Sequence, residues 1–323
     1  MSAHPRKRLA LVGAGVMGSN HARVVSRFED ADLVALIDPR EENGRALADA
    51  HGARWYPELP PLEGIDGVIV AAATEAHVPL ARQILEADVP LLLEKPVAAN
   101  LAESEAIVQL ADDRDLPLMC GLLERFNPAV LTARSFIESP VHVTGTRHSP
   151  YAPRIRTGVA WDLLVHDVDL AIMFAGTSPS EVSSSLGFFH DKSVPGAEDV
   201  AETVLTFPSG AIAHVSASRM GQRKIRSMSV HERDRLIEID LLRRDVTVYH
   251  HVSEDLVDGA NRGYRQQTVI EIPELVTSVE PLTAQLAHFC RIIDGADDAA
   301  QERRSILPSH RVVDRVLSTA AAQ

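Results

Sequence analysis

The stretch that decides the fold is LALVGAGVMGSNHARVV, residues Leu9–Val25. Its beginning is a short apolar run typical of a buried strand, and its end places apolar side chains at helical spacing. Between the two, Gly13, Gly15 and Gly18 have the spacing G-x-G-x-x-G. A glycine-rich turn that ends a strand and opens a helix predicts a dinucleotide-binding unit, because the backbone and the helix N-terminus can approach a pyrophosphate there.

The same alternation continues along the first part of the chain, as far as Gly121. Short apolar runs such as GVIVAAAT and PLLLEKP alternate with segments of helical periodicity. Strands this apolar, separated by helices of about ten residues, indicate a parallel sheet covered on both faces. We therefore predict an α/β protein in which residues 1–121 form a Rossmann domain with a doubly wound parallel sheet.

The sequence changes in character after Asn127. Between residues 182 and 252, several runs alternate polar and apolar side chains and are separated by turns such as FPSGA, which is typical of antiparallel strands. We predict that residues 122–323 form an α+β domain with a large, open, mostly antiparallel sheet, and that the last helix can pack back on the first domain. An apolar open face on this sheet would favour self-association.

The composition fits a folded protein of two domains. A chain of 323 residues is too long for one ordinary domain. The formal net charge of −13 argues against a nucleic-acid partner, because binding phosphates requires a basic surface. No apolar stretch approaches the roughly 20 residues that span a bilayer, so we expect no membrane contact. Cys120 and Cys290 lie in apolar surroundings and are interpreted as free thiols, which favours a cytoplasmic location.

The end of the second predicted strand carries Asp38, twenty residues beyond Gly18. A carboxylate there can accept hydrogen bonds from the adenine ribose and repels a 2′-phosphate, which favours NAD over NADP. Arg40 leaves NADP open, since a guanidinium could accommodate that phosphate. The residues expected to bind the nucleotide are Gly13, Gly15, Val16, Met17, Gly18, Asp38, Arg40, Thr74, His77, Glu94 and Lys95. For His77, a structural role is an equal alternative.

The segment LLLEKPVA places Lys95 at the carboxyl end of the fifth predicted strand. Ligands of open parallel sheets bind outside the carboxyl ends of the strands. The Lys95 ammonium could therefore hold a substrate hydroxyl and help its proton to leave. The alternative is a lysine that only marks the end of a strand.

A second candidate segment is TGVAWDLLVHDVDLAIMF, residues Thr157–Phe174. At helical spacing, Asp162, His166 and Asp169 share one narrow face of an otherwise apolar helix. Histidine is suited to proton transfer near neutral pH, so this face predicts acid–base chemistry. Asp167 points to the apolar side, and we expect it to find a donor there that holds the helix in place.

Taken together, these motifs resemble the family of glucose-fructose oxidoreductase and inositol dehydrogenase (Gfo/Idh/MocA). The resemblance covers nearly the whole chain, through the glycine-rich turn, AAATEAH, EKP, GLLERFNP and WDLLVHDVDL in that order. It implies an N-terminal Rossmann domain that binds a nicotinamide nucleotide. It also implies a C-terminal domain that binds substrate and forms a homodimer or homotetramer through its sheet.

The resemblance also implies which residues are catalytic. The lysine of the family's EKP motif is Lys95, and the aspartate and histidine of its D-x-x-x-H motif are Asp162 and His166. His166 would take the hydroxyl proton while the substrate carbon gives a hydride, and Asp162 and Lys95 would orient that hydroxyl. Two departures are Glu75, where many relatives have proline or a small residue, and Gly158, where many have two glycines.

The substrate class is suggested by LLERFNPAV, which is similar to family members that act on sugar nucleotides. The loop RHSPYAPRIR adds Arg147, Arg154 and Arg156, whose guanidinium groups suit phosphate recognition. A solvated basic loop is the alternative interpretation. The residues expected to bind substrate are Arg125, Asn127, Tyr151, Arg154, Arg156, Asp162 and His166.

We therefore predict an NAD-dependent oxidoreductase that transfers a hydride to or from a secondary alcohol or ketone on a sugar, cyclic polyol or sugar nucleotide. Three alternatives stay open. They are an NAD-dependent glycosidase of the same superfamily, a non-catalytic protein that senses nucleotide, and a metal site built from Asp162, His166 and Asp169. We expect no metal, because the proton relay explains these residues more simply.

Overall fold

The computed structural model describes residues 6–153, 155–258 and 261–321. Its contacts divide the chain into two compact units. Unit 1 comprises Met1–Leu123 and Val279–Asp314, and unit 2 comprises Glu124–Ser278 and Arg315–Gln323. The chain first passes from unit 1 to unit 2 after Leu123, two residues beyond the predicted domain boundary at residue 121. We expected that only the last helix could pack back on the first domain, whereas the return to unit 1 begins earlier, at Val279.

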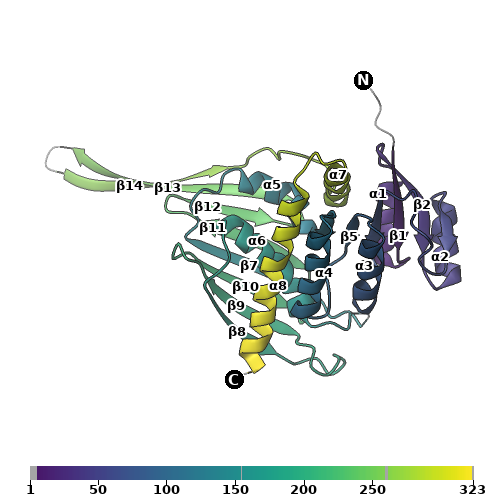
Figure 1. Ribbon diagram of the computed structural model, residues 1–323. Helices are drawn as coiled ribbons and strands as arrows, with labels where there is room; N and C mark the ends of the chain where they lie inside the picture. The colour runs from purple at the N-terminus through teal and green to yellow at the C-terminus, as the bar shows by residue number, and fades with distance from the viewer. Residues whose placement is uncertain (1–5, 154, 259–260, 322–323) are drawn as a thin grey trace. The chain divides into compact units, whose positions relative to one another are not determined.

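Unit 1 is built on a six-stranded parallel sheet in the order β3-β2-β1-β4-β5-β6 (Figure 1). The strand order reverses between β1 and β4, which is the Rossmann pattern. Most residues of the central strands are fully buried, as a sheet covered on both faces requires. The predicted doubly wound sheet is confirmed. Its strands are β1 (Lys7–Val12), β2 (Ala31–Ile37), β3 (Arg54–Tyr56), β4 (Gly67–Val70), β5 (Leu91–Leu93) and β6 (Leu118–Cys120).

The helices of unit 1 connect these strands and cover them. They are α1 (Val16–Val25), α2 (Glu41–Ala50), the short 3₁₀ helix η1 (Thr74–Ala76), α3 (His77–Glu86), α4 (Leu101–Asp113), α7 (Pro281–Ile293) and the first part of α8 (Ala299–Ala321). A further 3₁₀ turn, η2 (Leu123–Phe126), carries the chain into unit 2.

Helix α7 belongs to unit 1 because it completes the core and pairs with α1. Phe289 is fully buried, and a Cβ on Gly67 of β4 would lie 3.1 Å from its ring. Arg23 of α1 donates two hydrogen bonds to the Glu280 carboxylate, at 2.6 and 3.0 Å. The Rossmann domain therefore needs a segment that lies far beyond residue 121 in the sequence.

Unit 2 is built on an eight-stranded sheet in the order β14-β13-β12-β11-β7-β10-β9-β8 (Figure 1). All neighbouring strands are antiparallel except β7 and β10, so the predicted open, mostly antiparallel sheet is confirmed. Its strands are β7 (His142–His148), β8 (Glu181–Gly187), β9 (Val200–Thr206), β10 (Ile212–Ser218), β11 (Ile225–His231), β12 (Arg235–Asp240), β13 (Asp245–Asp258) and β14 (Asn261–Glu271).

One face of this sheet carries the helices α5 (Pro128–Arg134) and α6 (Val165–Ala175), the second of which continues a π-helical turn, η3 (Ala160–Leu164). Gly145 of β7 lies against α6, where a Cβ would lie 3.4 Å from the Asp167 Cβ and 3.1 Å from the Val215 Cγ1 of β10. The opposite face is polar rather than apolar. Thr144 and Ser229, for example, form a hydrogen bond of 2.5 Å across β7 and β11.

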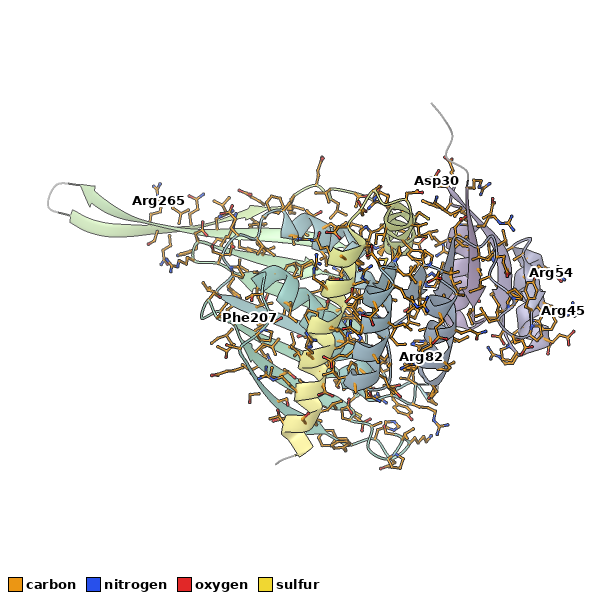
Figure 2. The ribbon with its side chains drawn as sticks, viewed as in Figure 1. Asp30, Arg45, Arg54, Arg82, Phe207 and Arg265 are labelled. Carbon is orange, nitrogen blue, oxygen red and sulfur yellow. The ribbon has the colours of Figure 1, made fainter. Side chains whose placement is uncertain are left out.

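The last two strands form a ribbon that continues beyond the rest of the sheet (Figure 1). β12 pairs with β13 only as far as His250, whereas β14 follows β13 to Asp258. Arg265 stands on this ribbon (Figure 2) and is exposed. Six of the fifteen exposed large apolar side chains among the described residues lie between Val252 and Val276. The ribbon and the segment after it therefore carry one group of exposed apolar side chains of unit 2, and Phe188 and Phe189 lie in another.

Within the described ranges, none of the helices combines the length and the apolar character needed to cross a membrane.

Candidate functional site

The glycine-rich turn of unit 1 has the geometry of a dinucleotide cradle. A Cβ on Gly13, whose φ is +104°, would lie 2.5 Å from the Ala71 carbonyl oxygen, and a Cβ on Gly18 would lie 1.8 Å from the Gly13 oxygen. Only glycine fits at either position. A Cβ on Gly15 would meet no atom within 4 Å among the described residues, which leaves open space where a pyrophosphate would approach the backbone.

Helix α1 begins at Val16, directly beside the open space next to Gly15. Gly15 is its N-cap, and no side chain of the described residues caps it, so its first N–H groups are available to an anion. Val16 is 65% exposed and Met17 is partly exposed at the same place. A turn that fits glycine only, followed by an open helix N-terminus, suits the diphosphate of NAD.

Asp38 lies at the carboxyl end of β2, as the sequence predicted. One carboxylate oxygen accepts a hydrogen bond from the Ala14 N–H at 2.7 Å, and the other accepts one from the Arg40 N–H at 2.9 Å. The Arg40 guanidinium adds two hydrogen bonds of 3.0 Å. Although burial opposes it, these donors lower the pKa of Asp38. Arg40 is thus bound to Asp38 rather than presented as a separate phosphate site.

Three other residues that we expected to bind nucleotide differ in their contacts. Thr74 is partly exposed in η1. His77 is buried, and its two ring nitrogens lie 2.8 Å from the Pro96 oxygen and 3.2 Å from the Ala72 oxygen. The Glu94 carboxylate is buried 2.9 Å from His21 Nε2. The polar atoms of His77 and Glu94 are directed at the protein, so their contacts are structural.

Lys95 follows β5 at the carboxyl edge of the sheet. Glu94 N donates to the Val70 oxygen at 2.9 Å, which continues the β4–β5 pairing up to the residue before the lysine. Lys95 itself is partly exposed. The strand therefore delivers this ammonium to the edge where ligands of parallel sheets bind.

The segment with Asp162 and His166 lies in unit 2 and begins as a π-helix, not as the regular helix that the periodicity predicted. The π turn covers Ala160–Leu164 and places Asp162 in it, while His166 lies in the first turn of α6. Both side chains are partly exposed. Short π-helical turns of this kind often occur at functional sites.

Glu198 holds the start of this segment. Its Oε1 accepts a hydrogen bond from the Ala160 N–H at 2.7 Å, and its backbone oxygen accepts one from Val159 at 3.1 Å. A Cβ on Gly158 would lie 2.0 Å from Glu198 Oε2, which explains the single glycine before the segment. Burial raises the pKa of Glu198, and the Ala160 hydrogen bond opposes this.

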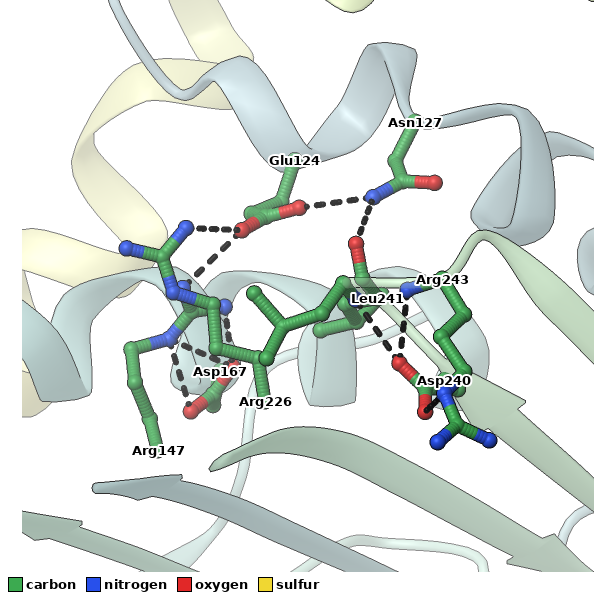
Figure 3. Close-up of polar contacts among 9 residues, drawn as sticks. Glu124, Asn127, Arg147, Asp167, Arg226, Asp240, Leu241 and Arg243 are labelled. Carbon is green, nitrogen blue, oxygen red and sulfur yellow. Dashed lines mark hydrogen bonds and ion pairs between the residues drawn. The ribbon is translucent and has the colours of Figure 1, made fainter. Parts of the chain in front are cut away.

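A buried ion cluster lies under the same segment (Figure 3). Arg147 is 1% exposed and donates to Asp167 Oδ1 at 2.7 Å and to Glu124 Oε1 at 2.9 Å. Burial opposes it, but the two carboxylates raise the pKa of Arg147 and keep it charged. The prediction that Asp167 finds a donor on the apolar side is confirmed. Arg147 is a core residue of β7, so its assignment to a phosphate-binding loop was wrong.

Arg226 of β11 joins this cluster through Glu124 and interacts electrostatically with Asp162. Its Nη1 lies 3.7 Å from Glu124 Oε1. Burial and the charge of Arg147 lower the pKa of Arg226, while Glu124, Asp167 and Asp162 oppose this. Asp162 therefore lies in the field of a partly buried guanidinium that the sequence reasoning did not identify.

Two residues expected to bind substrate have structural partners instead. Arg125 donates to both oxygens of Asp169, at 2.6 and 2.7 Å, in a largely buried pair. Asn127 is 3% exposed, caps α5 through the Ala129 N–H, and donates to Glu124 and to the Leu241 oxygen. Both side chains therefore stabilise unit 2, because their polar groups bind other protein groups within it.

The remaining expectations concern the loop before the catalytic segment. The Tyr151 hydroxyl donates to the Lys192 oxygen at 2.6 Å, and its ring stacks on His190 at 3.6 Å between centroids. Arg156 is exposed. Arg154 lies outside the described residues. Tyr151 therefore joins two loops of unit 2.

The ion pair between Arg125 and Asp169 also concerns the predicted alternative of a metal site. Asp169 is one of the three proposed metal ligands, and its carboxylate already binds Arg125. Over the described part of the chain, no cluster of three His, Cys, Asp or Glu side chains has the arrangement of a metal site.

The sequence reasoning missed Glu198 and Arg226. Glu198 lies forty residues beyond Gly158, and Arg226 lies beyond two further strands, so no spacing rule joins them to the catalytic segment. The one available signal was indirect, since a glycine before a helix can indicate close approach by another group.

Comparison with known proteins agrees with this geometry. Residues 7–122 match the model of the oxidoreductase family with an NAD-binding Rossmann fold, and residues 130–234 match the GFO/IDH/MocA C-terminal domain. The inositol 2-dehydrogenase of Rhizobium meliloti is 30% identical over 226 residues, which are 66% of this chain and 68% of that protein.

Two further similarities concern UDP-N-acetylglucosamine 3-dehydrogenase of Acidithiobacillus ferrooxidans. Its sequence is 28% identical over 269 residues, which are 79% of this chain and 84% of that protein. Its crystal structure superimposes with a TM-score of 0.81 at 24% identity, covering 98% of this chain and 99% of that one, and so has the same fold. The chain belongs to the GFO/IDH/MocA oxidoreductase family, and unit 1 contains the family's NAD-binding Rossmann domain.

Proposed function

We propose that the protein oxidises a secondary alcohol on a sugar-like ring, or reduces the matching ketone, with Lys95, Asp162 and His166 as its catalytic residues. The observation that carries this proposal is the way unit 2 holds Asp162 and His166. Both are partly exposed on a segment that is fixed by Glu198 at its start and by the Arg147–Asp167 pair beneath it. Fixed polar groups on a rigid element are what proton transfer in a defined geometry requires.

The roles follow from the chemistry of each side chain. NAD, when bound, accepts a hydride from the substrate carbon or gives one to it. His166 takes the hydroxyl proton in the oxidation, because imidazole can change its charge near neutral pH. Lys95 donates a hydrogen bond to the same oxygen and stabilises negative charge that develops on it. Asp162 accepts a hydrogen bond from the substrate beside that hydroxyl, and it interacts electrostatically with the guanidinium of Arg226.

Within this reaction class, we infer a sugar nucleotide as substrate. The relative named UDP-N-acetylglucosamine 3-dehydrogenase matches 79% of this chain, while the relative named inositol 2-dehydrogenase matches 66%. Arg156 is an exposed guanidinium in the loop before the catalytic segment and suits a phosphate. A free polyol would leave this charge without a partner.

The test is a substrate screen with matched variants. Purified protein is mixed with NAD and with UDP-N-acetylglucosamine, myo-inositol or free N-acetylglucosamine, and NADH absorbance is followed. The proposal expects turnover with the nucleotide sugar and a loss of about 100-fold or more in kcat for Lys95→Met and His166→Ala. Lys192→Met, which removes an exposed lysine of unit 2, is the control and should leave kcat unchanged.

Two outcomes would overturn parts of this proposal. Turnover that survives both Lys95→Met and His166→Ala would exclude these residues as catalytic. Turnover with myo-inositol but not with the sugar nucleotide would keep the reaction and exclude the substrate class.

We further propose that the protein forms a homodimer or homotetramer through the β13–β14 ribbon. Ile270 and Val269 on this ribbon, and Ile272 and Val276 after it, are exposed. A two-stranded ribbon with exposed apolar side chains is a poor monomer surface in water. Light scattering after size exclusion should give a multiple of the 35.1 kDa chain mass for the wild type. Ile270→Lys should shift it toward the monomer, and Arg82→Glu on α3 is the control.

A cytoplasmic location is part of the same proposal. Cys120 and Cys290 are both free and buried, and burial raises the pKa of Cys290 to about 11, which keeps it as an inert thiol. Thiols in this state fit a reducing compartment.

A further inference from the structure

The turn that carries Lys95 is held by three buried histidines from three different helices of unit 1. These are His21 of α1, His77 at the start of α3 and His310 of α8, which are 2%, 1% and 0% exposed. Each contacts a different residue of the four-residue stretch Glu94–Val97. Buried histidines are uncommon enough that three around one turn need an explanation.

His21 acts through the Glu94 side chain. Its Nε2 lies 2.9 Å from Glu94 Oε1, and the other carboxylate oxygen accepts the Lys95 backbone N–H at 3.3 Å. Gly121 leaves room for this carboxylate, since a Cβ there would lie 2.5 Å from Glu94 Oε2. The backbone of Lys95 is therefore tied to α1, the helix that opens at the glycine-rich turn.

The other two histidines hold the residues that follow the lysine. His77 Nδ1 donates to the Pro96 oxygen at 2.8 Å. The Val97 N–H donates to His310 Nε2 at 3.3 Å, so that nitrogen is an acceptor. His310 Nδ1 must then carry the proton, which it donates to the Ile306 oxygen at 2.9 Å. The ring orientation of His310 is thus fixed at both nitrogens.

We propose that His21, His77 and His310 form a histidine cradle that positions Lys95, and that they are positioning residues of the reaction. An ordinary strand end would leave the lysine backbone free to move, because loops after strands are usually the mobile part of such folds. The cradle instead holds this stretch of backbone through contacts with three helices. The role of Lys95 rests on the proposed function, whereas its fixation by the cradle does not.

A direct readout is the reactivity of the Lys95 amine. The chain has four lysines, Lys7, Lys95, Lys192 and Lys224, so an acetylating reagent followed by mass spectrometry resolves each of them. In His21→Leu and His310→Leu, Lys95 should react about threefold or more faster relative to the other three, because its backbone is released. His21→Gln keeps an N–H donor near the Nε2 position and should restore the wild-type rate to within about twofold.

The kinetic readout separates positioning from general destabilisation. Both leucine variants should lower kcat about tenfold or more and leave the KM for NAD within about twofold of wild type. The matched control is His288→Leu, which removes another histidine of unit 1 that contacts Asp297 and Glu302 instead of the turn. It should lower stability and leave both kcat and the Lys95 labelling unchanged.

The outcomes distinguish the cradle from the proposed function. Unchanged Lys95 labelling in folded leucine variants would overturn the cradle, even if the enzyme is active. Labelling that responds as expected in a protein that turns over no sugar would keep the cradle and exclude the proposed reaction. If a leucine variant does not fold, Gly121→Ala displaces the Glu94 carboxylate without touching a histidine and must give the same faster labelling.

Discussion

The glycine-rich turn of unit 1 and the segment Ala160–Ala175 of unit 2 are both held in place, but by different kinds of contact. The turn from Gly13 to Gly18 is held by close backbone packing, which excludes a Cβ at two of its three glycines, and by the Asp38 carboxylate, which accepts the Ala14 N–H. The segment from Ala160 to Ala175 is fixed by charged side chains that come from distant strands and loops. Close backbone packing does not depend on the protonation of side chains. A segment held by buried charges, in contrast, loses stability when any one of its charged partners is removed.

Removing one partner of the buried cluster should have the largest effect. Arg147→Met leaves Asp167 and Glu124 as buried carboxylates without their main cation. We expect the free energy of unfolding to fall by about 3–5 kcal/mol, measured by urea denaturation. Arg243→Met, which changes an arginine that is largely exposed, should change the same quantity by less than about 0.5 kcal/mol.

The double variant Arg147→Met with Asp167→Leu checks the reason for this loss. If uncompensated charge is the cause, removing Asp167 as well should recover part of the stability. A double variant less stable than Arg147→Met alone would mean that packing, not charge, fixes the segment.

Adding one methyl group to the turn should have the next largest effect. Gly18→Ala places a Cβ 1.8 Å from the Gly13 oxygen, so we expect a loss of about 1–3 kcal/mol of stability and loss of NAD binding. Gly15→Ala places its Cβ in open space, so it should leave thermal stability unchanged and still prevent NAD binding. A thermal-shift titration with NAD measures both quantities.

The predicted difference between the two glycines would be contradicted if Gly18→Ala and Gly15→Ala had the same effects on stability and NAD binding. Equal losses of stability would mean that Gly15 is also confined by the protein, and retained NAD affinity in Gly15→Ala would mean that the backbone there does not approach the diphosphate.

A smaller effect is expected at Asp38. Asp38→Asn weakens the hydrogen bonds that hold the Arg40 guanidinium and removes the charge that repels a 2′-phosphate. The ratio of the dissociation constants of NADP and NAD should therefore fall about tenfold or more, which corresponds to roughly 1.4 kcal/mol. Fluorescence titration with NADH and NADPH measures the ratio. Arg40→Ala added to this variant should reverse the gain for NADPH, and an unchanged ratio would exclude Arg40 as the phosphate partner.

The smallest effect concerns pH. The hydrogen bond with Glu302 raises the pKa of His288, partial burial opposes it, and Asp297 adds to the rise. Because the folded-state pKa lies above the unfolded value of about 6.5, the stabilisation is complete below that pH and is lost as the pH rises through the folded-state pKa. His288→Gln should thus cost up to about 1 kcal/mol more at acidic than at alkaline pH, by urea denaturation at both. An equal loss of unfolding free energy at acidic and alkaline pH would contradict a raised pKa of His288.

Much of unit 1 could be predicted from the sequence because backbone requirements leave marks at fixed spacing. Gly13, Gly15 and Gly18 mark the turn, and Asp38 follows at the end of the next strand. The return of α7 to this unit could not be predicted, since an amphipathic helix shows that it has an apolar face and not which sheet that face covers.

In unit 2, the pattern predicted the sheet and a partner for Asp167, but it did not predict the protein partners of the polar residues around the site. Arg125, Asn127 and Arg147 were taken as ligands of a substrate, and all three bind protein groups. The residue type alone does not tell whether the partner of a guanidinium is a phosphate or a buried carboxylate. That distinction depends on Asp169 and Glu124, whose positions only the folded chain determines.

The discontinuity of unit 1 has a consequence for synthesis. A growing chain makes the six strands of its parallel sheet within the first 123 residues, yet the helix that buries Phe289 against Gly67, α7, is made only after residue 280. While residues 124–278 are added, that part of the sheet stays uncovered and exposes apolar side chains to other chains. The nucleotide-binding domain begins first and is completed only after most of unit 2 has been made, so the period of greatest risk of aggregation is the translation of residues 124–278.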